Sequence, residues 1–283
     1  PMCGRCLCCA TGRPALCETG AAANAAGTLL GGDVRFHKGA TRILHHLGVS
    51  AFSHYTVAAQ ESLIKIDRSV PLQTAALFGC AILTGVGAVT NTAKVAPGQS
   101  AAVFGLGGVG LSAVMGARLA GAFPIIAVDT LPAKLALARE LGAHHTIDAN
   151  ADDVVSTIAD LTGGGVDFAF EAVGSAAVLA VAYNSVRRGG TAVSVGLPHP
   201  DQQLSIQAVS LAGQEKCIRG SYMGSAVPRR DVPRLIGLSQ SGALPVDALV
   251  SPSISLEDIN IGFDRLADGS AIRQLVQFDN QKH

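Results

Sequence analysis

The sequence predicts an α/β fold built on a doubly wound parallel sheet, and three observations support this. Apolar runs that resemble strands alternate with segments of helical periodicity from residue 101 onward, with glycines between many of them. The 283 residues are 48% hydrophobic and only 15% charged, which suits strands that are buried on both faces. The expected strands number six, enough for two mononucleotide-binding halves: residues 101–104, 125–129, 145–147, 167–171, 191–195 and 217–223.

The segment from Ala101 to Asp129 has the layout of a dinucleotide-binding βαβ unit. An apolar strand leads into a G-x-G-x-x-G turn, and the next apolar strand ends in an acid 19 residues after the last glycine. The first glycine permits the tight turn, the second lets a pyrophosphate approach the backbone, and the third lets helix and strand pack closely. The turn consists of Gly105, Leu106, Gly107, Gly108, Val109 and Gly110.

Asp129 predicts which dinucleotide binds. Its carboxylate can accept hydrogen bonds from both adenosine-ribose hydroxyls and would repel a 2′-phosphate. Thr130 and Leu131 supply no cation, so NAD is favoured over NADP. The alternative is that the glycines serve only a tight turn, and the flanking strands and the correctly spaced acid argue against it.

The first seventeen residues indicate a structural metal site. Cys3, Cys6, Cys9 and Cys17 follow a C-x₂-C-x₂-C-x₇-C spacing, and four thiolates close a tetrahedral zinc shell with no open position. Cys8 breaks the spacing and is expected to be a bystander. The alternative is a set of free or oxidisable thiols.

Composition excludes several classes of function and partner. Acids and bases number 21 each, so there is no electrostatic case for nucleic acid or an anionic membrane surface. We see no membrane span and no signal peptide. Clustered cysteines of this kind indicate a reducing compartment, so a cytoplasmic location is expected. The chain begins at Pro1, already inside the cysteine motif, and we expect a fragment that lacks its true N-terminus.

Outside the expected sheet, the pattern is less regular. Residues 18–48 read as a loop in which His37, His45 and His46 are surface or packing residues rather than metal ligands. Strands are expected at 53–59, 63–66 and 272–278. Helices are expected at 71–80, 84–93, 108–120, 132–141, 152–161, 176–186 and 231–240, and after a capping box at 255–258 through residue 266.

Taken together, these motifs resemble the zinc-containing alcohol dehydrogenases of the medium-chain dehydrogenase/reductase family. The resemblance runs from Cys3 to Phe278 and includes the cysteine lobe, VFGLGGVG, EAVG at 171–174, VGLP at 195–198 and IRQLVQF. It implies a Rossmann NAD-binding domain at 81–223, inserted in a truncated GroES-like mainly-β catalytic domain at 1–80 and 224–283. It also implies NAD and zinc as cofactors, a small alcohol or aldehyde substrate, and a homodimer or homotetramer.

The resemblance implies roles for further residues. Cys80 would be one ligand of a catalytic zinc, whose other protein ligands the family takes from a region upstream of the cysteine lobe. A lone cysteine is otherwise most often a small buried residue. His45, His46 and His54 are not placed at that metal by the resemblance. The remaining implied cofactor contacts are Thr84 near the nicotinamide, Lys134 beside the adenosine ribose, Arg273 near the phosphates, and Val173, Val195 and Gly196 at the sheet edge.

The expected activity is NAD-linked oxidation of a primary alcohol, aromatic alcohols included, or the reverse reaction. The family branch that acts on the glutathione adduct of formaldehyde has an arginine shortly after the last structural cysteine, and residues 18–22 contain no cation. One alternative is a non-catalytic fragment that binds NAD and zinc. Another is a zinc-independent reductase of the same superfamily, which the four-cysteine lobe disfavours.

Overall fold

The computed structural model describes residues 1–278 and divides into two compact units. The first unit comprises residues 1–71, 226–233 and 251 onward, and the second comprises 72–225 and 234–250. The division falls at 71/72, whereas the sequence analysis placed the corresponding boundary at 80/81. Residues 234–250 return to the second unit, although the sequence analysis had placed them with the first.

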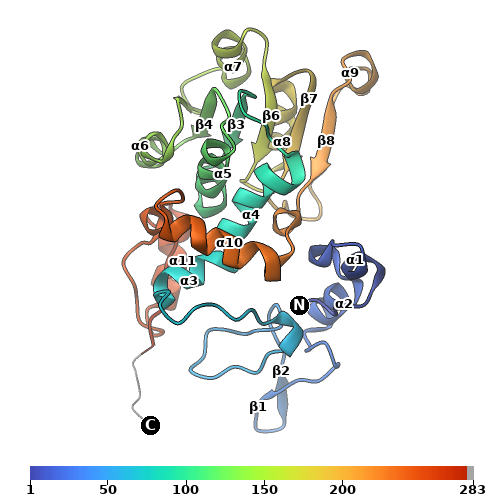
Figure 1. The fold of residues 1–283 in the computed structure, drawn as a ribbon, viewed down its shortest axis with the longest axis vertical. Helices are drawn as coiled ribbons and strands as arrows, with labels where there is room; N and C mark the ends of the chain where they lie inside the picture. The colour runs from blue at the N-terminus through green and yellow to red at the C-terminus, as the bar shows by residue number, and fades with distance from the viewer. Residues whose placement is uncertain (279–283) are drawn as a thin grey trace. The chain divides into compact units, whose positions relative to one another are not determined.

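The second unit contains the expected doubly wound sheet (Figure 1). Its six strands are all parallel and lie in the order β5-β4-β3-β6-β7-β8, so the chain moves outward from β3 in one direction and from β6 in the other. All six predicted strands are present, and the sheet buries most of the apolar runs β3, β4 and β6, whereas the edge strands β5 and β8 are more exposed. Their bounds are β3 Ala101–Phe104, β4 Ile125–Asp129, β5 His145–Asp148, β6 Val166–Glu171, β7 Val186–Ser194 and β8 Cys217–Gly220.

Helices cover both faces of this sheet. On one face, α7 and α8 bury their apolar side chains against Ala102, Phe104 and the neighbouring strands. The opposite face contacts α5 and α6. The helices span α5 Gly108–Leu119, α6 Pro132–Leu141, α7 Val154–Thr162, α8 Ala176–Ser185 and α9 Ala208–Gly213.

A further helix, α4 (Ala81–Gly87), packs closely on α5. A Cβ on Gly85 would lie 2.3 Å from the Val109 carbonyl oxygen, so only glycine allows this approach. A π-helical turn, η3 (Ala88–Ala93), continues α4, and α3 (Leu72–Phe78) precedes it. Within residues 1–278 no single helix is long and apolar enough to span a membrane. The pair formed by α3 and Ala81–Ala93 reaches that length and apolarity only when the two are counted together, across a bend of 44°.

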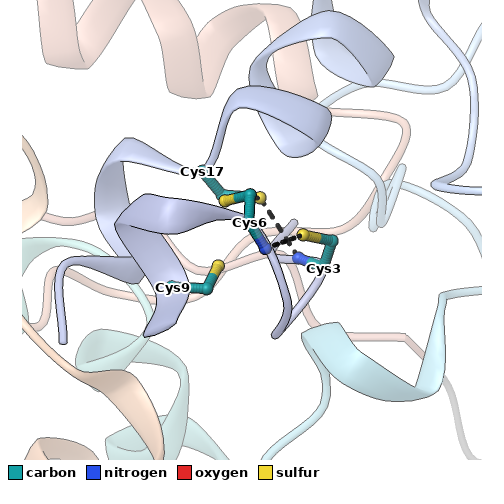
Figure 2. A group of neighbouring side chains, drawn as sticks. All are labelled: Cys3, Cys6, Cys9 and Cys17. Carbon is teal, nitrogen blue, oxygen red and sulfur yellow. Dashed lines mark hydrogen bonds between the residues drawn. The ribbon is translucent and has the colours of Figure 1, made fainter. Parts of the chain in front are cut away.

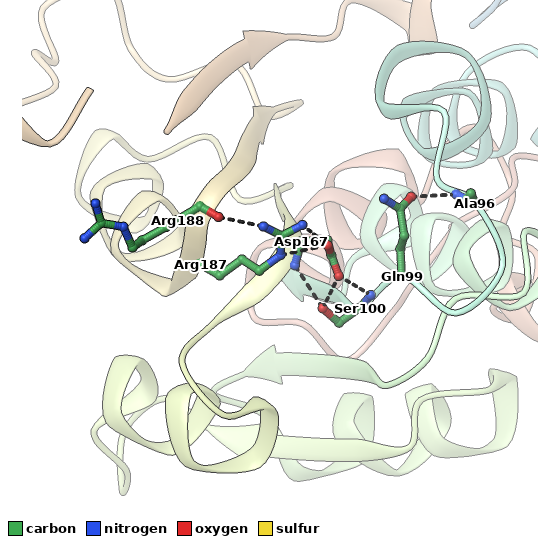
Figure 3. A network of polar contacts seen from close by, with 6 residues as sticks. All are labelled: Ala96, Gln99, Ser100, Asp167, Arg187 and Arg188. Atoms are coloured by element: carbon green, nitrogen blue, oxygen red, sulfur yellow. Dashed lines mark hydrogen bonds and ion pairs between the residues drawn. The ribbon is translucent and has the colours of Figure 1, made fainter. Parts of the chain in front are cut away.

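At the amino-terminal edge of the sheet, one carboxylate joins three strands (Figure 3). Asp167 accepts hydrogen bonds from the Ser100 N–H and hydroxyl at 2.8 and 2.7 Å, and Arg187 pairs with its other oxygen at 2.6 Å. Burial alone would raise the pKa of Asp167, but the Ser100 hydrogen bonds and the Arg187 charge outweigh it and hold that pKa below its usual range. The starts of β3, β6 and β7 are therefore tied together.

The first unit differs most from expectation. Residues 18–26 form a helix, α2 (Glu18–Ala26), where a loop was predicted. The Cys17 sulfur caps this helix by accepting the Gly20 N–H at 3.2 Å, and Gly27 ends it with φ +63°. The rest of the N-terminal part consists of α1 Leu7–Ala10, η1 Pro14–Leu16, the antiparallel pair β1 Phe36–Lys38 and β2 Thr41–Ile43, and η2 Gln60–Ser62.

The strands predicted at 53–59 and 63–66 are wrong. Bends and η2 occupy this stretch, and none of the described residues pairs with it in a sheet ladder. Tyr55 and Leu63 are 67% and 56% exposed, so the apolar alternation does not correspond to a buried face here. Alternation predicts a strand only when a partner strand supplies the hydrogen bonds.

The tail also departs from prediction in detail. The predicted capping box is wrong: the Ser255 hydroxyl donates to the Asp258 carboxylate at 3.1 Å, but the helix begins after Asp258, whose side chain makes no capping hydrogen bond. The strand predicted at 272–278 is wrong in extent, because it is replaced by isolated bridge residues at Arg273 and at Val276, which pairs with Ile254. The remaining elements are η4 Met223–Ser225, α10 Pro228–Gln240, η5 Val246–Leu249 and α11 Ile259–Ala267.

Candidate functional site

The G-x-G-x-x-G turn lies where the strand order of the sheet reverses. It connects the carboxyl end of β3 to α5, and β3 is flanked by β4 on one side and β6 on the other. In open α/β sheets this switch point is where ligands bind, just beyond the carboxyl ends of the strands. The residue types predicted to hold a dinucleotide are therefore at the position that can hold one.

The glycines of this turn do different jobs. Gly105 has φ +84°, and a Cβ there would lie 2.4 Å from Val173 Cγ2. A Cβ on Gly110 would lie 1.8 Å from the Gly105 carbonyl oxygen. These two glycines are required by the fold itself, since a side chain at Gly105 would collide with the neighbouring loop and one at Gly110 would collide with the turn itself.

Gly107 is different. Its φ of −71° suits any residue, and a Cβ built there would meet nothing within 4 Å. The same glycine is the N-cap of α5, with no side chain accepting the first helical N–H groups. The missing side chain leaves open space in front of those N–H groups and the positive end of the helix, as a bound pyrophosphate needs. Gly108, Val109 and Gly110 form the first turn of that helix.

Asp129 is the last residue of β4, and its half-buried carboxylate reaches the same turn. One oxygen accepts the Leu106 N–H at 2.6 Å, and the other accepts the N–H groups of Thr130 and Leu131 at 2.8 and 3.0 Å. A carboxylate offers about four acceptor positions, so one remains for a ligand hydroxyl. Lys134 follows in the first turn of α6, half-buried.

The sequence analysis assigned no role to Glu171, the last residue of β6. Its side chain is only 1% exposed, and one oxygen accepts the N–H groups of Val173, Gly174 and Ser175 at 2.8, 2.6 and 3.2 Å. The E-A-V-G motif showed that an acid stands here, but nothing in it indicated that the acid folds back onto its own loop.

The remaining residues of the predicted cofactor set divide between the two units. Val173 is 55% exposed at the end of β6, whereas Val195 is buried after β7 and Gly196 follows it. Thr84, on α4, is 7% exposed and donates a long hydrogen bond to Met223 Sδ at 4.0 Å. Arg273 belongs to the other unit, so its place beside the cofactor phosphates stays a prediction.

The four predicted metal ligands come together in the first unit (Figure 2). The sulfur atoms of Cys3, Cys6, Cys9 and Cys17 all lie within 4.8 Å of one another. The Cys3 N–H donates to Cys17 Sγ at 3.2 Å, and the Cys6 N–H donates to Cys3 Sγ at 3.3 Å. Four converging sulfurs with N–H donors around them fit a tetrahedral structural zinc.

The thiol pKa values reflect this geometry. Backbone N–H groups of Arg5 and Cys6 lower the pKa of Cys3 to about 6, and burial raises the pKa of Cys9 to about 12. The backbone N–H hydrogen bonds also lower the pKa of Cys6. Cys8 is not part of the cluster, as expected.

Cys80 has no comparable cluster of metal-ligating side chains around it among the described residues. It is exposed at the start of α4, and no group of three or more close metal-ligating side chains within residues 1–278 includes it. A catalytic zinc needs three protein ligands. Its predicted role as a catalytic zinc ligand therefore stays a prediction.

Comparisons with known proteins found a matching family, similar sequences and similar structures. Residues 108–241 match the family described as "Zinc-binding dehydrogenase". The chain is 39% identical to an S-(hydroxymethyl)glutathione dehydrogenase of Synechocystis sp. over 279 residues, covering 98% of this chain and 75% of the relative.

Two solved structures are similar over almost the whole chain. An alcohol dehydrogenase zinc-binding domain protein from Burkholderia ambifaria is 38% identical, with a TM-score of 0.94 over 99% of this chain and 76% of the other. The benzyl alcohol dehydrogenase of Acinetobacter calcoaceticus is 32% identical, with a TM-score of 0.90 over 98% of this chain and 75% of the other. The similarity therefore extends over residues of both units.

Proposed function

Because the chain belongs to the family of zinc-binding alcohol dehydrogenases, we propose that it binds NAD at the turn between β3 and α5. When Cys80 and further ligands hold a catalytic zinc, the protein oxidises primary alcohols or reduces the corresponding aldehydes. The observation that carries the proposal is the open space at Gly107. A side chain at this position would meet no protein atom within 4 Å, so the glycine is not needed for packing, and it leaves the N-terminus of α5 open to a phosphate.

Several residues of the second unit have a part in holding the cofactor in this proposal. The N–H groups at the start of α5 bind the pyrophosphate, and the remaining acceptor position of Asp129 binds an adenosine-ribose hydroxyl. Lys134 flanks that ribose, and Thr84 packs against the nicotinamide. The negative charge of Asp129 opposes a 2′-phosphate, so NAD is the preferred form.

Zinc has two distinct roles in the proposal. The four-cysteine cluster holds a structural ion, since four sulfurs leave no position for a substrate. A catalytic zinc held by Cys80 and further ligands would supply Lewis-acid chemistry to the alcohol. The described residues gather no further ligands there, so no step is assigned through this ion in the chain alone.

The substrate proposal favours ordinary primary alcohols, aromatic ones included. The first turn of α2 carries Glu18, and residues 18–22 contain no cation that would pair with a glutathione carboxylate. The glutathione adduct of formaldehyde is the second candidate, because the Synechocystis relative carries that name. For assembly, we propose a homodimer or homotetramer in which the outer edge of β8 contributes to a subunit contact.

Two measurements test the proposal. Titration with NADH and NADPH, followed by nicotinamide fluorescence, should show tighter binding of NADH. Zinc analysis should give one tightly held ion per chain. An activity assay of the same protein should show no alcohol-dependent NAD reduction. A chain that binds neither dinucleotide would contradict the proposal, and turnover that Cys80→Ala abolishes would show that the catalytic zinc is already complete. The two substrate candidates are separated by assaying a protein in which the catalytic zinc is complete. One assay supplies benzyl alcohol, and the other supplies glutathione together with formaldehyde.

A further inference from the structure

Strand β6 carries a carboxylate near each end, and the two do different things. Asp167 ties the strand starts together, whereas Glu171 is buried at the cofactor edge. Three successive N–H groups, those of Val173, Gly174 and Ser175, donate to a single oxygen of Glu171. The backbone carbonyl of Glu171 also accepts the N–H groups that follow β7, those of Val195 and Gly196, both at 2.9 Å.

Successive backbone N–H groups that converge on one point are how proteins bind anions. The loop Val173–Ser175 leads from β6 into α8, just as the glycine turn leads from β3 into α5. At α5 no side chain caps the N–H groups. In the second loop the anion is supplied from within, by the Glu171 carboxylate. The sheet edge therefore offers one open anion cradle and one that is already filled.

The loop Val173–Ser175 is packed closely against the glycine turn, with almost no free space between them. A Cβ on Gly105 would lie 3.2 Å from the Val173 nitrogen, and one on Gly196 would lie 2.2 Å from the Gly174 nitrogen. The same Cβ on Gly196 would lie 3.0 Å from the second oxygen of Glu171. Closely packed groups transmit displacements, so movement of the loop would move both glycines.

We propose that Glu171 is a positioning residue for the dinucleotide, acting as an internal anion. Its carboxylate orders the loop Val173–Ser175, and this loop in turn sets the positions of Gly105 and Gly196 around the cofactor. Glu171 itself need not touch the ligand. This inference rests on the proposed NAD-binding function of the same edge.

The test compares Glu171→Ala and Glu171→Gln with Asp167→Asn, which alters the carboxylate near the other end of β6. Glu171→Ala should weaken NADH binding about tenfold or more, because three hydrogen bonds to a charged acceptor are lost. Excess formate, a carboxylate that fits the vacated space, should restore much of the affinity in Glu171→Ala and leave the wild type unchanged. Glu171→Gln keeps one carbonyl acceptor and should bind NADH within about threefold of the wild type.

The control separates positioning from general destabilisation. Asp167→Asn should lower the melting temperature yet leave NADH affinity within about twofold of the wild type. The proposal fails if Glu171→Ala binds NADH as the wild type does, if Asp167→Asn weakens binding equally, or if formate restores nothing. Amide hydrogen exchange at Val173–Ser175, measured without dinucleotide, should be faster in Glu171→Ala and slowed again by formate. If the wild type binds no NADH, the proposed function fails, and this exchange result still decides whether Glu171 orders the loop.

Discussion

The Asp129 carboxylate accepts the Leu106 N–H at 2.6 Å, so the residue expected to select NAD also holds the glycine turn. Replacing it therefore has two consequences. Asp129→Gly removes the charge that opposes a 2′-phosphate and should shift the NADH-to-NADPH affinity ratio toward NADPH by about tenfold or more. It should also weaken NADH itself, since the turn loses an anchor. Parallel fluorescence titrations with both dinucleotides measure the ratio.

Asp148 provides a matched control for this prediction. It ends β5 directly beside Asp129 in the sheet register and accepts the Asn150 N–H at 2.9 Å, away from the glycine turn. Asp148→Asn should leave the affinity ratio unchanged. If Asp129→Gly also left the ratio unchanged, the carboxylate would have no part in selecting the dinucleotide.

Gly107 and Gly110 should respond in opposite ways to the addition of one methyl group. At Gly107 the space is open and the backbone is ordinary, so Gly107→Ala should change the free energy of unfolding by less than about 1 kcal/mol while weakening NADH binding. At Gly110 the methyl would meet the Gly105 carbonyl, and Gly110→Ala should cost about 1–3 kcal/mol or more of stability. Urea unfolding beside NADH titration distinguishes them. A Gly107→Ala protein that binds NADH normally would contradict the phosphate cradle.

The parts of the fold that the sequence predicts well are those whose signal is local. The strands β3, β4 and β6 are apolar runs that the sheet buries, so each is recognised from its own residues. The more exposed edge strands β5 and β8 are recognised from their place in the alternation of strands and helices. The cysteine cluster was predictable for the same reason, since short spacers force Cys3, Cys6 and Cys9 together. The glycine turn and Asp129 are likewise read within one βαβ unit.

The failures depend on partners that a local pattern does not reveal. Residues 53–66 alternate like strands but have no partner strand among the described residues. The helix at 18–26 lacks a strong apolar face, and its cap is a cysteine sulfur rather than the usual oxygen. Glu171 was missed because an acid at a strand end looks the same in sequence whether it faces solvent or folds back into the structure.

The cysteine cluster should behave as one unit. Cys6→Ser should release the structural zinc and lower the stability of the first unit, because four sulfurs are needed for a closed shell. Zinc content measured after dialysis should fall from one per chain to near zero. Cys8→Ser is the matched control, since Cys8 is next to Cys9 but outside the cluster, and it should keep its zinc. Equal zinc loss in both variants would mean that the ligand set is wrong.

The Ser100–Asp167 network should make stability depend on pH. The folded-state pKa of Asp167 lies below its usual range, and an unfolded aspartate titrates near about 3.9. The stabilisation is therefore fully present above that value and is lost as the pH falls through the folded-state pKa. Asp167→Asn should lower the free energy of unfolding by about 1–3 kcal/mol at neutral pH, and this difference from the wild type should become smaller below about pH 4. Urea unfolding across this range measures the difference. The control is Asp201→Asn, because the Asp201 carboxylate is 91% exposed; this variant should lose almost no free energy of unfolding at any pH. If the stability difference between Asp167→Asn and the wild type stayed constant in acid, the network would be ruled out as its cause.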